Sequence, residues 1–157
     1  MKRSLYRQVG KRVLDVVLVA AASPLLLPLF VLLAAAVKLT SRGPVFYRQV
    51  RAGRHGDLFD LLKFRSMVVG AERMGAGVRV EPNDARITAV GRLLRRFSLD
   101  EIPQIVNVVR GQMSLIGPRP ALPYPVAQYT SAQRRRLEVR PGLTGWAQVN
   151  GRNVINW

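Results

Sequence analysis

One apolar segment near the N-terminus constrains this chain more than any other feature. No ionisable residue occurs in the 22 residues from Val16 to Val37, a length that forms a helix of about 33 Å. The hydrocarbon core of a bilayer is about 30 Å thick. The segment is also longer than the roughly 7–15 apolar residues of a cleavable signal peptide. It therefore favours a membrane helix, with a signal peptide and a simple transmembrane span as the alternatives.

Two details argue against a straight transmembrane span. Ser23, Pro24 and Pro28 interrupt the middle of the segment, and each interior proline removes a backbone hydrogen bond at a cost of about 3 kcal/mol. We expect the Ser23 hydroxyl to bond back to the Val19 carbonyl. Basic residues flank the segment on both sides, so the positive-inside rule gives no orientation. A re-entrant helix that bends at Ser23-Pro24 satisfies both details, although kinked spanning helices also exist.

The amino-acid composition limits the kinds of site and partner that this chain can have. The 157 residues suit a single domain. With no cysteine and one histidine, a disulfide framework, a thiolate site and a histidine-rich zinc site are excluded. A catalytic metal would be bound by oxygen, which favours Mg²⁺. The net charge of +16, carried mainly by 21 arginines among 25 basic residues, predicts a polyanionic partner. Nucleic acid, an anionic membrane surface and a nucleotide substrate all remain open.

The chain after Lys38 is rich in glycine and proline, which allows only short elements. The hydrophobic patterns predict a helix-rich α/β fold. Strands are expected at Val45–Gln49 and Leu58–Phe64, around a turn at Arg51–Asp57, and helices at Ile87–Phe97, Leu99–Arg110 and Thr130–Val139.

Two adjacent acids, Asp100 and Glu101, stand out among only nine acidic residues. In a structural interpretation they belong to a capping box, with Ser98 as the N-cap and Glu101 reaching back to it. In a catalytic interpretation, helix N–H groups and arginines keep the pKa of Asp100 low, and the ionised carboxylate attacks phosphorus. Glu101 would then project about 100° away around the helix and divide the work with a Mg²⁺ ion.

Several basic motifs surround these acids, but standard nucleotide-binding fingerprints are absent. The arginine of Gly117-Pro118-Arg119-Pro120 is the most informative, because a guanidinium on a rigid backbone loses little freedom when it binds an anion. The segment from Arg92 to Phe97 fits either an amphipathic helix at a lipid interface or a core helix with a solvated face. His55, the sole histidine, is expected at the surface.

A series of motifs follows in order along almost the whole chain. The motifs are Lys11-Arg12-x-x-Asp15, Ser23-Pro24, Gly43-Pro44-Val45-Phe46, Gln49-x-Arg51-x-Gly53, Lys63-Phe64-Arg65-Ser66-Met67, Ser98-Leu99-Asp100-Glu101-Ile102-Pro103-Gln104, Asn107, Met113-Ser114-Leu115-Ile116-Gly117-Pro118-Arg119-Pro120 and the segment from Pro141 to Asn153. Together they closely resemble the bacterial sugar transferases known as monotopic phosphoglycosyl transferases, in a short catalytic-core form.

This resemblance implies a fold and a location. It implies a single monotopic membrane domain over residues 1–157, with a basic arm at 1–12, a re-entrant helix at 13–37 broken at Ser23-Pro24, and a small catalytic part at 38–157. Amphipathic interfacial helices and short strands would build the catalytic part. The location would be the cytoplasmic face of the bacterial inner membrane. Because relatives of this kind continue past the Gly151-Arg152-Asn153 segment, we expect the chain to be truncated at its C-terminus.

The resemblance also implies a reaction and its participants. A phosphosugar would move from a nucleotide diphosphate sugar, usually a UDP-sugar, to polyprenyl phosphate such as undecaprenyl phosphate, as the first membrane step of glycan assembly. Exopolysaccharide, capsule, O-antigen and glycoprotein glycans are the products expected. Asp100 would form a covalent aspartyl phosphosugar, Glu101 would bind metal or assist proton balance, and Asp100 and Glu101 would share Mg²⁺. The implied phosphate-binding and substrate-binding residues are Lys63, Arg95, Arg119 and Arg152.

Other functions compete with this interpretation. The high positive charge also suits a membrane-tethered nucleic-acid-binding protein, but the chain lacks regular aromatic spacing and known binding motifs, so nucleic acid is not an expected partner. An inactive fragment or scaffold is a third reading. Anionic lipids are expected partners, and association into a homo-oligomer stays open.

Overall fold

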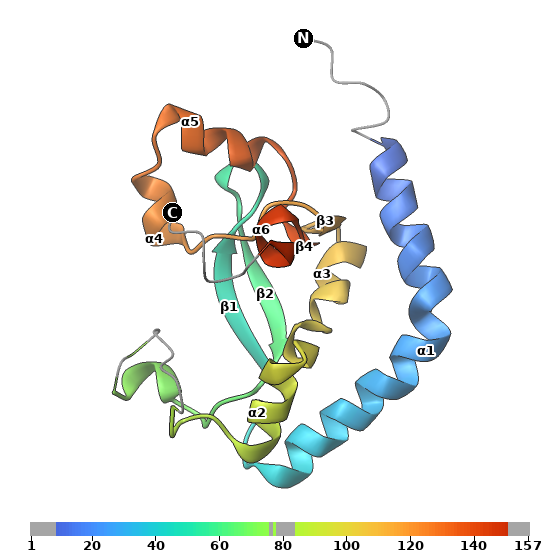
Figure 1. The fold of residues 1–157 in the computed structure, drawn as a ribbon, viewed down its shortest axis with the longest axis vertical. Coiled ribbons are helices and arrows are strands. Elements are labelled where there is room, and N and C mark those ends of the chain that lie inside the picture. The colour runs from blue at the N-terminus through green and yellow to red at the C-terminus, as the bar shows by residue number, and fades with distance from the viewer. Residues whose placement is uncertain (1–8, 76, 78–83, 151–157) are drawn as a thin grey trace. The chain divides into compact units, whose positions relative to one another are not determined.

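The computed structural model describes residues 9–75, 77 and 84–150 (Figure 1). The helices in this part are α1 (Lys11–Thr40), α2 (Ala89–Arg96), α3 (Gln104–Val109), α4 (Pro123–Ala127), α5 (Ser131–Arg134) and α6 (Trp146–Val149). The strands are β1 (Phe46–Ala52), β2 (Leu58–Phe64), β3 (Ser114–Ile116) and β4 (Gly142–Thr144). Short 3₁₀ helices are η2 (Arg54–Gly56), η3 (Ala71–Arg73), η4 (Leu99–Glu101) and η5 (Arg135–Glu138). The predicted helix-rich α/β class is confirmed.

The first three elements after α1 follow the sequence pattern closely. Strand β2 has the predicted bounds, and β1 continues beyond the predicted end at Gln49. The two strands pair with each other around a turn at residues 53–57. His55 is exposed in this turn, as predicted, with a left-handed φ of 59°. Helix α2 starts after Thr88, whose hydroxyl accepts a hydrogen bond of 2.9 Å from the Gly91 N–H and so caps the helix.

The predicted helix at residues 99–110 is wrong as a single element. Its residues form η4 and then α3, and Pro103 lies between them. Proline has no N–H to continue a helical ladder, so the chain makes one 3₁₀ turn before α3 begins. The helix predicted at residues 130–139 is likewise divided into α5, which Thr130 and Gln133 cap reciprocally, and η5. The sequence patterns did not predict β3, β4, α4 or α6.

Helix α1 is continuous through Ser23, Pro24 and Pro28, so the prediction is wrong in that the helix is not interrupted at Ser23-Pro24. The re-entrant bend at these residues stays a prediction. Pro24 cannot donate to the Ala20 carbonyl, four residues earlier. The Ser23 hydroxyl donates a bond of 2.7 Å to that same carbonyl, and not to the carbonyl of Val19 as the sequence suggested. The side chain therefore replaces the bond that the proline removes, which lets the helix continue.

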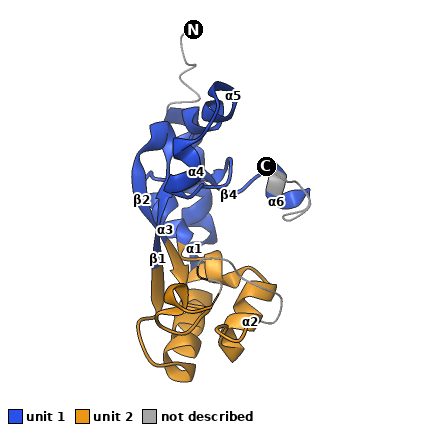
Figure 2. Ribbon diagram, turned by 90° about the vertical axis from the view of Figure 1, so that its left-hand side faces the viewer, with its two compact units in different colours: residues 1–24, 48–61, 104–157 blue, residues 25–47, 62–103 orange. Residues whose placement is uncertain are grey.

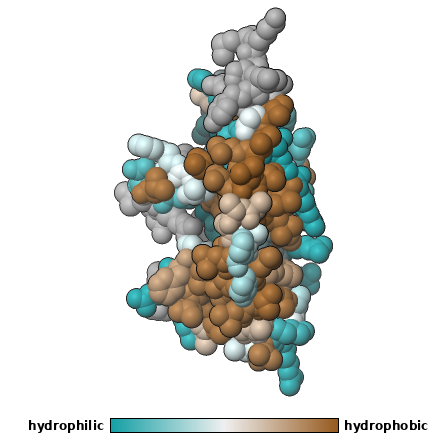
Figure 3. Space-filling view, turned by 90° about the vertical axis from the view of Figure 1, so that its right-hand side faces the viewer, coloured by the Kyte–Doolittle hydropathy of each residue, from teal (hydrophilic) through white to brown (hydrophobic). Residues whose placement is uncertain are grey.

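Most of α1 is exposed. Its most apolar 18-residue window has a mean hydropathy of 2.6, and only 6% of that window is buried. Figure 3 shows apolar side chains gathered over this helix. Exposed apolar residues are costly in water, so α1, which is long enough to cross a bilayer, indicates association with a membrane.

The chain divides into two compact units (Figure 2). Unit 1 comprises residues 1–24, 48–61 and 104–157, and unit 2 comprises residues 25–47 and 62–103. In unit 1, Phe59, Leu61, Val108 and Met113 form the core. The parallel strands β3 and β4 also lie in this unit, with Ser114 opposite Gly142 and Ile116 opposite Thr144.

Unit 2 has a separate core that includes the second half of α1. Leu33 and Val37 of α1 are buried with Phe64 and Leu94. The rings of Phe30, Phe46 and Phe64 lie 5.0–5.8 Å apart, a spacing typical of favourable aromatic pairs. The apolar helix is therefore a structural part of this unit and not only an appendage to it.

Candidate active site

Asp100 and Glu101 lie in unit 2 on η4, and both are buried, at 9% and 8% exposed. The predicted capping box is wrong. Ser98 has a left-handed conformation, with φ of 57°, and its side chain makes no capping hydrogen bond. The turn closes instead through the backbone, where the Ile102 N–H donates to the Leu99 carbonyl at 3.2 Å. The Ser98 side chain therefore does not cap this turn.

Lys63, at the end of β2, reaches the acidic pair. Its Nζ lies 3.0 Å from Glu101 Oε1, and the side chains are 16% and 10% exposed. A buried ion pair is costly to break, because one charge is then left without compensation in a poorly solvated site. The pair therefore fixes the end of β2 against η4 and holds Glu101 in place.

Arg95 brings a second cation to the site from α2. Its Nη1 lies 3.4 Å from Ser66 Oγ, and its charge acts on Asp100. The helix that carries Arg95 packs very closely on the segment after β2: a Cβ added at Gly91 would lie 1.9 Å from the Ser66 carbonyl oxygen. The Thr88 N–H also donates to this oxygen at 3.1 Å. Gly91 and Ser66 thus determine where Arg95 lies.

The electrostatics of Asp100 differ from the sequence expectation. Burial raises the pKa of this carboxyl above its usual value, and the negative charge of Glu101 adds to the rise, whereas Lys63 and Arg95 oppose it. The prediction of a lowered pKa is wrong because desolvation of the buried carboxylate outweighs the two cations. Added positive charge near Asp100 would lower its pKa and favour the ionised carboxylate. A shifted pKa of this kind is typical of functional carboxyls.

Apolar residues on either side of the acidic pair anchor η4 in the core of unit 2. Leu99 and Ile102, on either side of the acidic pair, pack against the core of Leu33, Val37, Phe64 and Leu94. The hydrophobic core of unit 2 is therefore built around the same turn that presents the carboxylates. A substitution in this core can be expected to move them.

The other predicted site residues are placed elsewhere. Arg119 lies in unit 1, in the loop after β3, where its carbonyl accepts a bond of 2.9 Å from Arg136 and the carbonyl of Pro120 accepts one of 3.3 Å from Arg51. Arg119 and Arg136 also line a small pocket of unit 1. Arg152 lies outside the described residues. The structure thus brings Lys63, Arg95, Asp100 and Glu101 together in unit 2.

Sequence reasoning missed two contributors to this arrangement. Gly91 gave a signal in retrospect, because a lone glycine inside a helical pattern often marks a close approach of backbones. The pairing of Lys63 with Glu101 gave none, since the two residues are 38 positions apart and share no local pattern.

The chain as a whole is similar to known proteins. Residues 6–157 match the family described as Bacterial sugar transferase. The chain belongs to this family. Its sugar transferase relatives include an uncharacterized sugar transferase, EpsL, of Bacillus subtilis (50% identical over 123 residues) and the exopolysaccharide production protein ExoY of Rhizobium meliloti (41% over 162 residues).

A third sugar transferase relative has a specific activity in its name. It is a UDP-glucose:undecaprenyl-phosphate glucose-1-phosphate transferase of Escherichia coli, 45% identical over 144 residues. These three alignments cover 78%, 94% and 90% of this chain and 59%, 72% and 31% of the respective relatives. The chain is thus a homologue of phosphoglycosyl transferases and spans only part of the length of the relatives it matches.

Proposed function

We propose that this sugar transferase moves a phosphosugar from a UDP-sugar to undecaprenyl phosphate, as an early membrane step of exopolysaccharide assembly. The observation that supports the proposal is the buried Asp100 beside Glu101, with the Lys63 and Arg95 cations acting on its charge. Phosphoryl transfer depends mainly on positioning and charge neutralisation. The names of the relatives support the class of donor and acceptor.

In the proposed reaction, Asp100 acts as the nucleophile. One carboxylate oxygen attacks the phosphorus that bears the sugar, the bond from this phosphorus to the bridging oxygen breaks, and UMP leaves with that electron pair. The product on the enzyme is an aspartyl phosphosugar. A phosphate oxygen of undecaprenyl phosphate then attacks the same phosphorus and displaces Asp100, which gives the diphosphate-linked sugar and regenerates the carboxylate.

The basic residues would position the acidic pair and bind the phosphate groups of the substrates. Lys63 orients Glu101 through their 3.0 Å ion pair, and we assign Arg95 to charge stabilisation at the reacting phosphorus. Arg119 and Arg152 are further proposed phosphate-binding residues, as the family resemblance suggests. Guanidinium groups suit this work because they bind phosphate oxygens in pairs.

Mg²⁺ is the proposed cofactor. Adjacent carboxylates at Asp100 and Glu101 are hard oxygen donors that fit Mg²⁺, which proteins often bind through one or two carboxylates and substrate phosphates. Within the described residues, no group of three or more His, Cys, Asp or Glu side chains gathers, so donor phosphates would complete the ligand set. When bound, the ion would neutralise charge on the departing nucleotide phosphate.

We propose a re-entrant topology for α1, which its contacts support, with the active site on the cytoplasmic face as the family resemblance implies. Near its start, Asp15 bonds to Ser114 and Leu115. Near its end, Leu33 and Val37 pack on Phe64 and Leu94. All these partners follow α1 in elements too short to cross hydrocarbon. A helix that crossed the bilayer would carry its first turn away from them.

The reaction is tested by supplying a panel of UDP-sugars, Mg²⁺ and undecaprenyl phosphate to protein in detergent and measuring UMP. Asp100→Asn should abolish UMP release, and Asp57→Asn, at an exposed acid, should leave it unchanged. Omission of the acceptor should leave a phosphosugar adduct on Asp100, detected by mass spectrometry. UMP formation at the native rate by Asp100→Asn, or an adduct on another residue, would contradict the mechanism.

Topology needs a separate test, and the absence of cysteine from the chain makes single-cysteine labelling clean. Cysteine at Val9, before α1, or at Asp57, an exposed residue in the polar turn after β1, should react with a membrane-impermeant maleimide only after the cells are opened. Labelling of Val9→Cys in intact spheroplasts would instead demonstrate a full span.

The proposed cofactor is tested by removing Mg²⁺ with a chelator, which should stop UMP formation. Restoring Mg²⁺ should then restore UMP formation.

A further inference from the structure

We propose that the loop after β2 is a second membrane contact of unit 2 and docks on the anionic surface of the bilayer beside the end of α1. This inference rests on the membrane association of α1 and not on the proposed reaction. The interfacial patch comprises apolar Leu39, Phe46, Val68, Val69 and Met74 with basic Lys38, Arg42 and Arg73.

The apolar members of the interfacial patch are exposed, with Val69 at 61% and Met74 at 49%. Isolated exposed apolar residues are ordinary in proteins, but these residues lie on connected segments of one unit. Val69 Cγ2 would lie only 2.6 Å from a Cβ added at Gly43, three residues after α1 ends. The Tyr47 hydroxyl, next to Phe46, bonds to Glu72 of the loop. Val69 therefore lies beside the turn that follows α1, and the Tyr47–Glu72 bond ties the loop to β1.

The loop is also tied directly to the end of α1. Arg65 donates to the carbonyls of Ser41 and Arg42 at 2.8 and 2.7 Å. These carbonyls follow the last turn of the helix, where backbone acceptors lack helical partners. The position of the loop is thus fixed relative to the point at which an apolar helix leaves the hydrocarbon.

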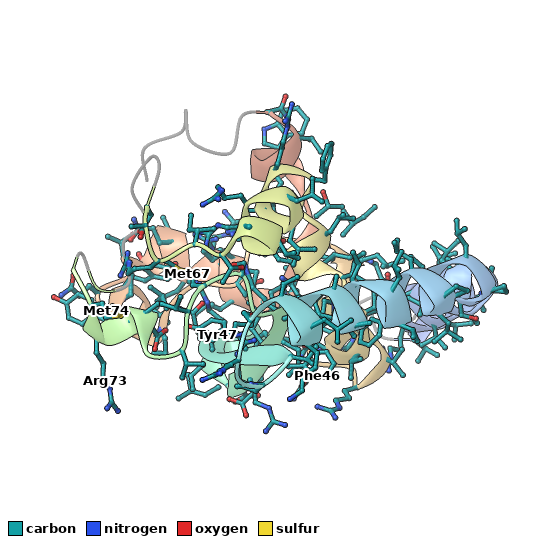
Figure 4. The ribbon with its side chains drawn as sticks, turned by 90° about the horizontal axis from the view of Figure 1, so that it is seen from below. Phe46, Tyr47, Met67, Arg73 and Met74 are labelled. Atoms are coloured by element: carbon teal, nitrogen blue, oxygen red, sulfur yellow. The ribbon has the colours of Figure 1, made fainter. Side chains whose placement is uncertain are left out.

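A buried arginine fixes the backbone shape of this loop. Arg86 Nη1 donates to the carbonyls of Ala71 and Met74, each at 2.7 Å, and its other nitrogens bond to Asp84 at 2.9 and 2.6 Å. The backbone of the loop therefore folds around this guanidinium, while its apolar side chains stay outside. Figure 4 shows Arg73 and Met74 on this loop, with the Arg73 side chain extending away from it. Such preorganisation lowers the entropy lost on docking.

The basic residues of the interfacial patch favour an anionic lipid surface as its partner. Lys38, Arg42 and Arg73 are exposed on the same segments as the apolar members, and the acid next to Arg73, Glu72, is bonded to Tyr47. Basic residues around a small apolar surface are attracted to anionic head groups while the apolar groups enter the boundary with the acyl chains. Continuity with α1 favours this surface over a protein partner.

Accessibility of a spin label measures the docking directly. We would prepare Val69→Cys and Met74→Cys in the cysteine-free full chain, label them, and place the protein in nanodiscs with about one-third phosphatidylglycerol, an anionic content suited to basic surfaces. Leu25→Cys, at 78% exposure on the apolar helix, serves as the lipid reference. Asp57→Cys in the polar turn serves as the aqueous reference. Collision with oxygen and with a water-soluble nickel chelate is then compared.

Labels at 69 and 74 should resemble the Leu25 label, with high oxygen and low nickel access. Values that match the Asp57 label would overturn the proposal. In the Arg73→Glu background, nickel access at 69 should rise, and more at low salt than at high salt, because the lost attraction is electrostatic.

Two further measurements separate this proposal from others. Apart from the scaffold protein at the disc edge, the nanodiscs contain no other protein and no polyprenyl phosphate. The labels should be protected equally in liposomes of the same lipids, which have no scaffold, so that lipid is the source of the protection; loss of protection in liposomes would overturn the proposal. Protection that appears only after polyprenyl phosphate is added would show a substrate site and would overturn bilayer docking. Because no substrate is needed, failure of the proposed reaction would leave this result intact.

Discussion

The Ser114 hydroxyl donates a hydrogen bond of 2.7 Å to the Asp15 carboxylate, across 99 positions of sequence. The same carboxylate accepts bonds from Lys11 and from the Leu115 N–H, at 3.0 and 3.2 Å. Arg12 adds bonds to the carbonyls of Val108 and Val109 at the end of α3. A buried acid, 3% exposed, thus fastens the first turns of the membrane helix to β3.

Removal of this contact should destabilise the protein. Asp15→Ala leaves the Ser114 hydroxyl and the Leu115 N–H without this acceptor, and hydrogen bonds to charged groups contribute about 1.5–3 kcal/mol. For a chain of this size we expect a fall in Tm of roughly 4–8 °C in detergent. A double-mutant cycle with Ser114→Ala should give a coupling energy above about 0.5 kcal/mol. Additive effects of the two changes would contradict the contact, and Asp57→Ala is the control.

Asp100→Asn should stabilise the protein while it inactivates it. Because the folded-state pKa is raised above the usual 3.8, the folded protein holds this proton more tightly than the unfolded chain. The carboxyl therefore contributes stability at low pH that is lost as pH rises through the raised pKa. The neutral amide avoids that loss. The variant should be the more stable protein at about pH 7, and its advantage should shrink toward about pH 3.

This pH dependence is measured by thermal unfolding in detergent with a chelator present. Asp57→Asn, an exposed substitution, should track the native protein across the range. A variant at position 100 that is less stable than the native protein at neutral pH would show that burial does not penalise the charged carboxylate.

Lys63→Met should impair catalysis more than substrate binding. The change removes the ammonium 3.0 Å from Glu101 and one of two cations that lower the pKa of Asp100. We expect UMP formation to fall by roughly 10²–10³-fold, as loss of a preorganised electrostatic contact does elsewhere, mostly in kcat. Lys63→Arg should retain part of the rate. Arg110→Met, at an exposed cation, is the matched control, and an equal loss there would remove the special role of Lys63.

Gly91→Ala should displace α2. The new Cβ would meet the Ser66 carbonyl oxygen at 1.9 Å, and overpacking of this kind costs about 1–3 kcal/mol. Because Arg95 lies on the same helix, UMP formation should fall together with Tm. Ala89→Ser, at an exposed position of the first turn, should change neither. Native activity in Gly91→Ala would show that the position of Arg95 does not depend on this packing.

Patterns that are local in the chain were readable before the structure. The short, mainly apolar segment at residues 58–64, preceded by the turn at 51–57, predicted β2 correctly, because a short apolar run beside a turn signal is typical of a strand. The apolar segment predicted α1 by its length, and the prediction of a break in the helix failed because Ser23 bonds to the carbonyl that Pro24 leaves free. Short strands such as β3 and β4 carried too few residues to form a pattern.

The sequence by itself determined the membrane helix, the family and the acidic pair at positions 100 and 101, since each depends on residues that are neighbours in the chain. Only the tertiary structure decided that Lys63 meets Glu101, that Asp15 meets Ser114, and that burial raises the pKa of Asp100. These contacts join residues 38 and 99 positions apart. Their energies depend on which groups exclude water from one another, and that is set when the core closes.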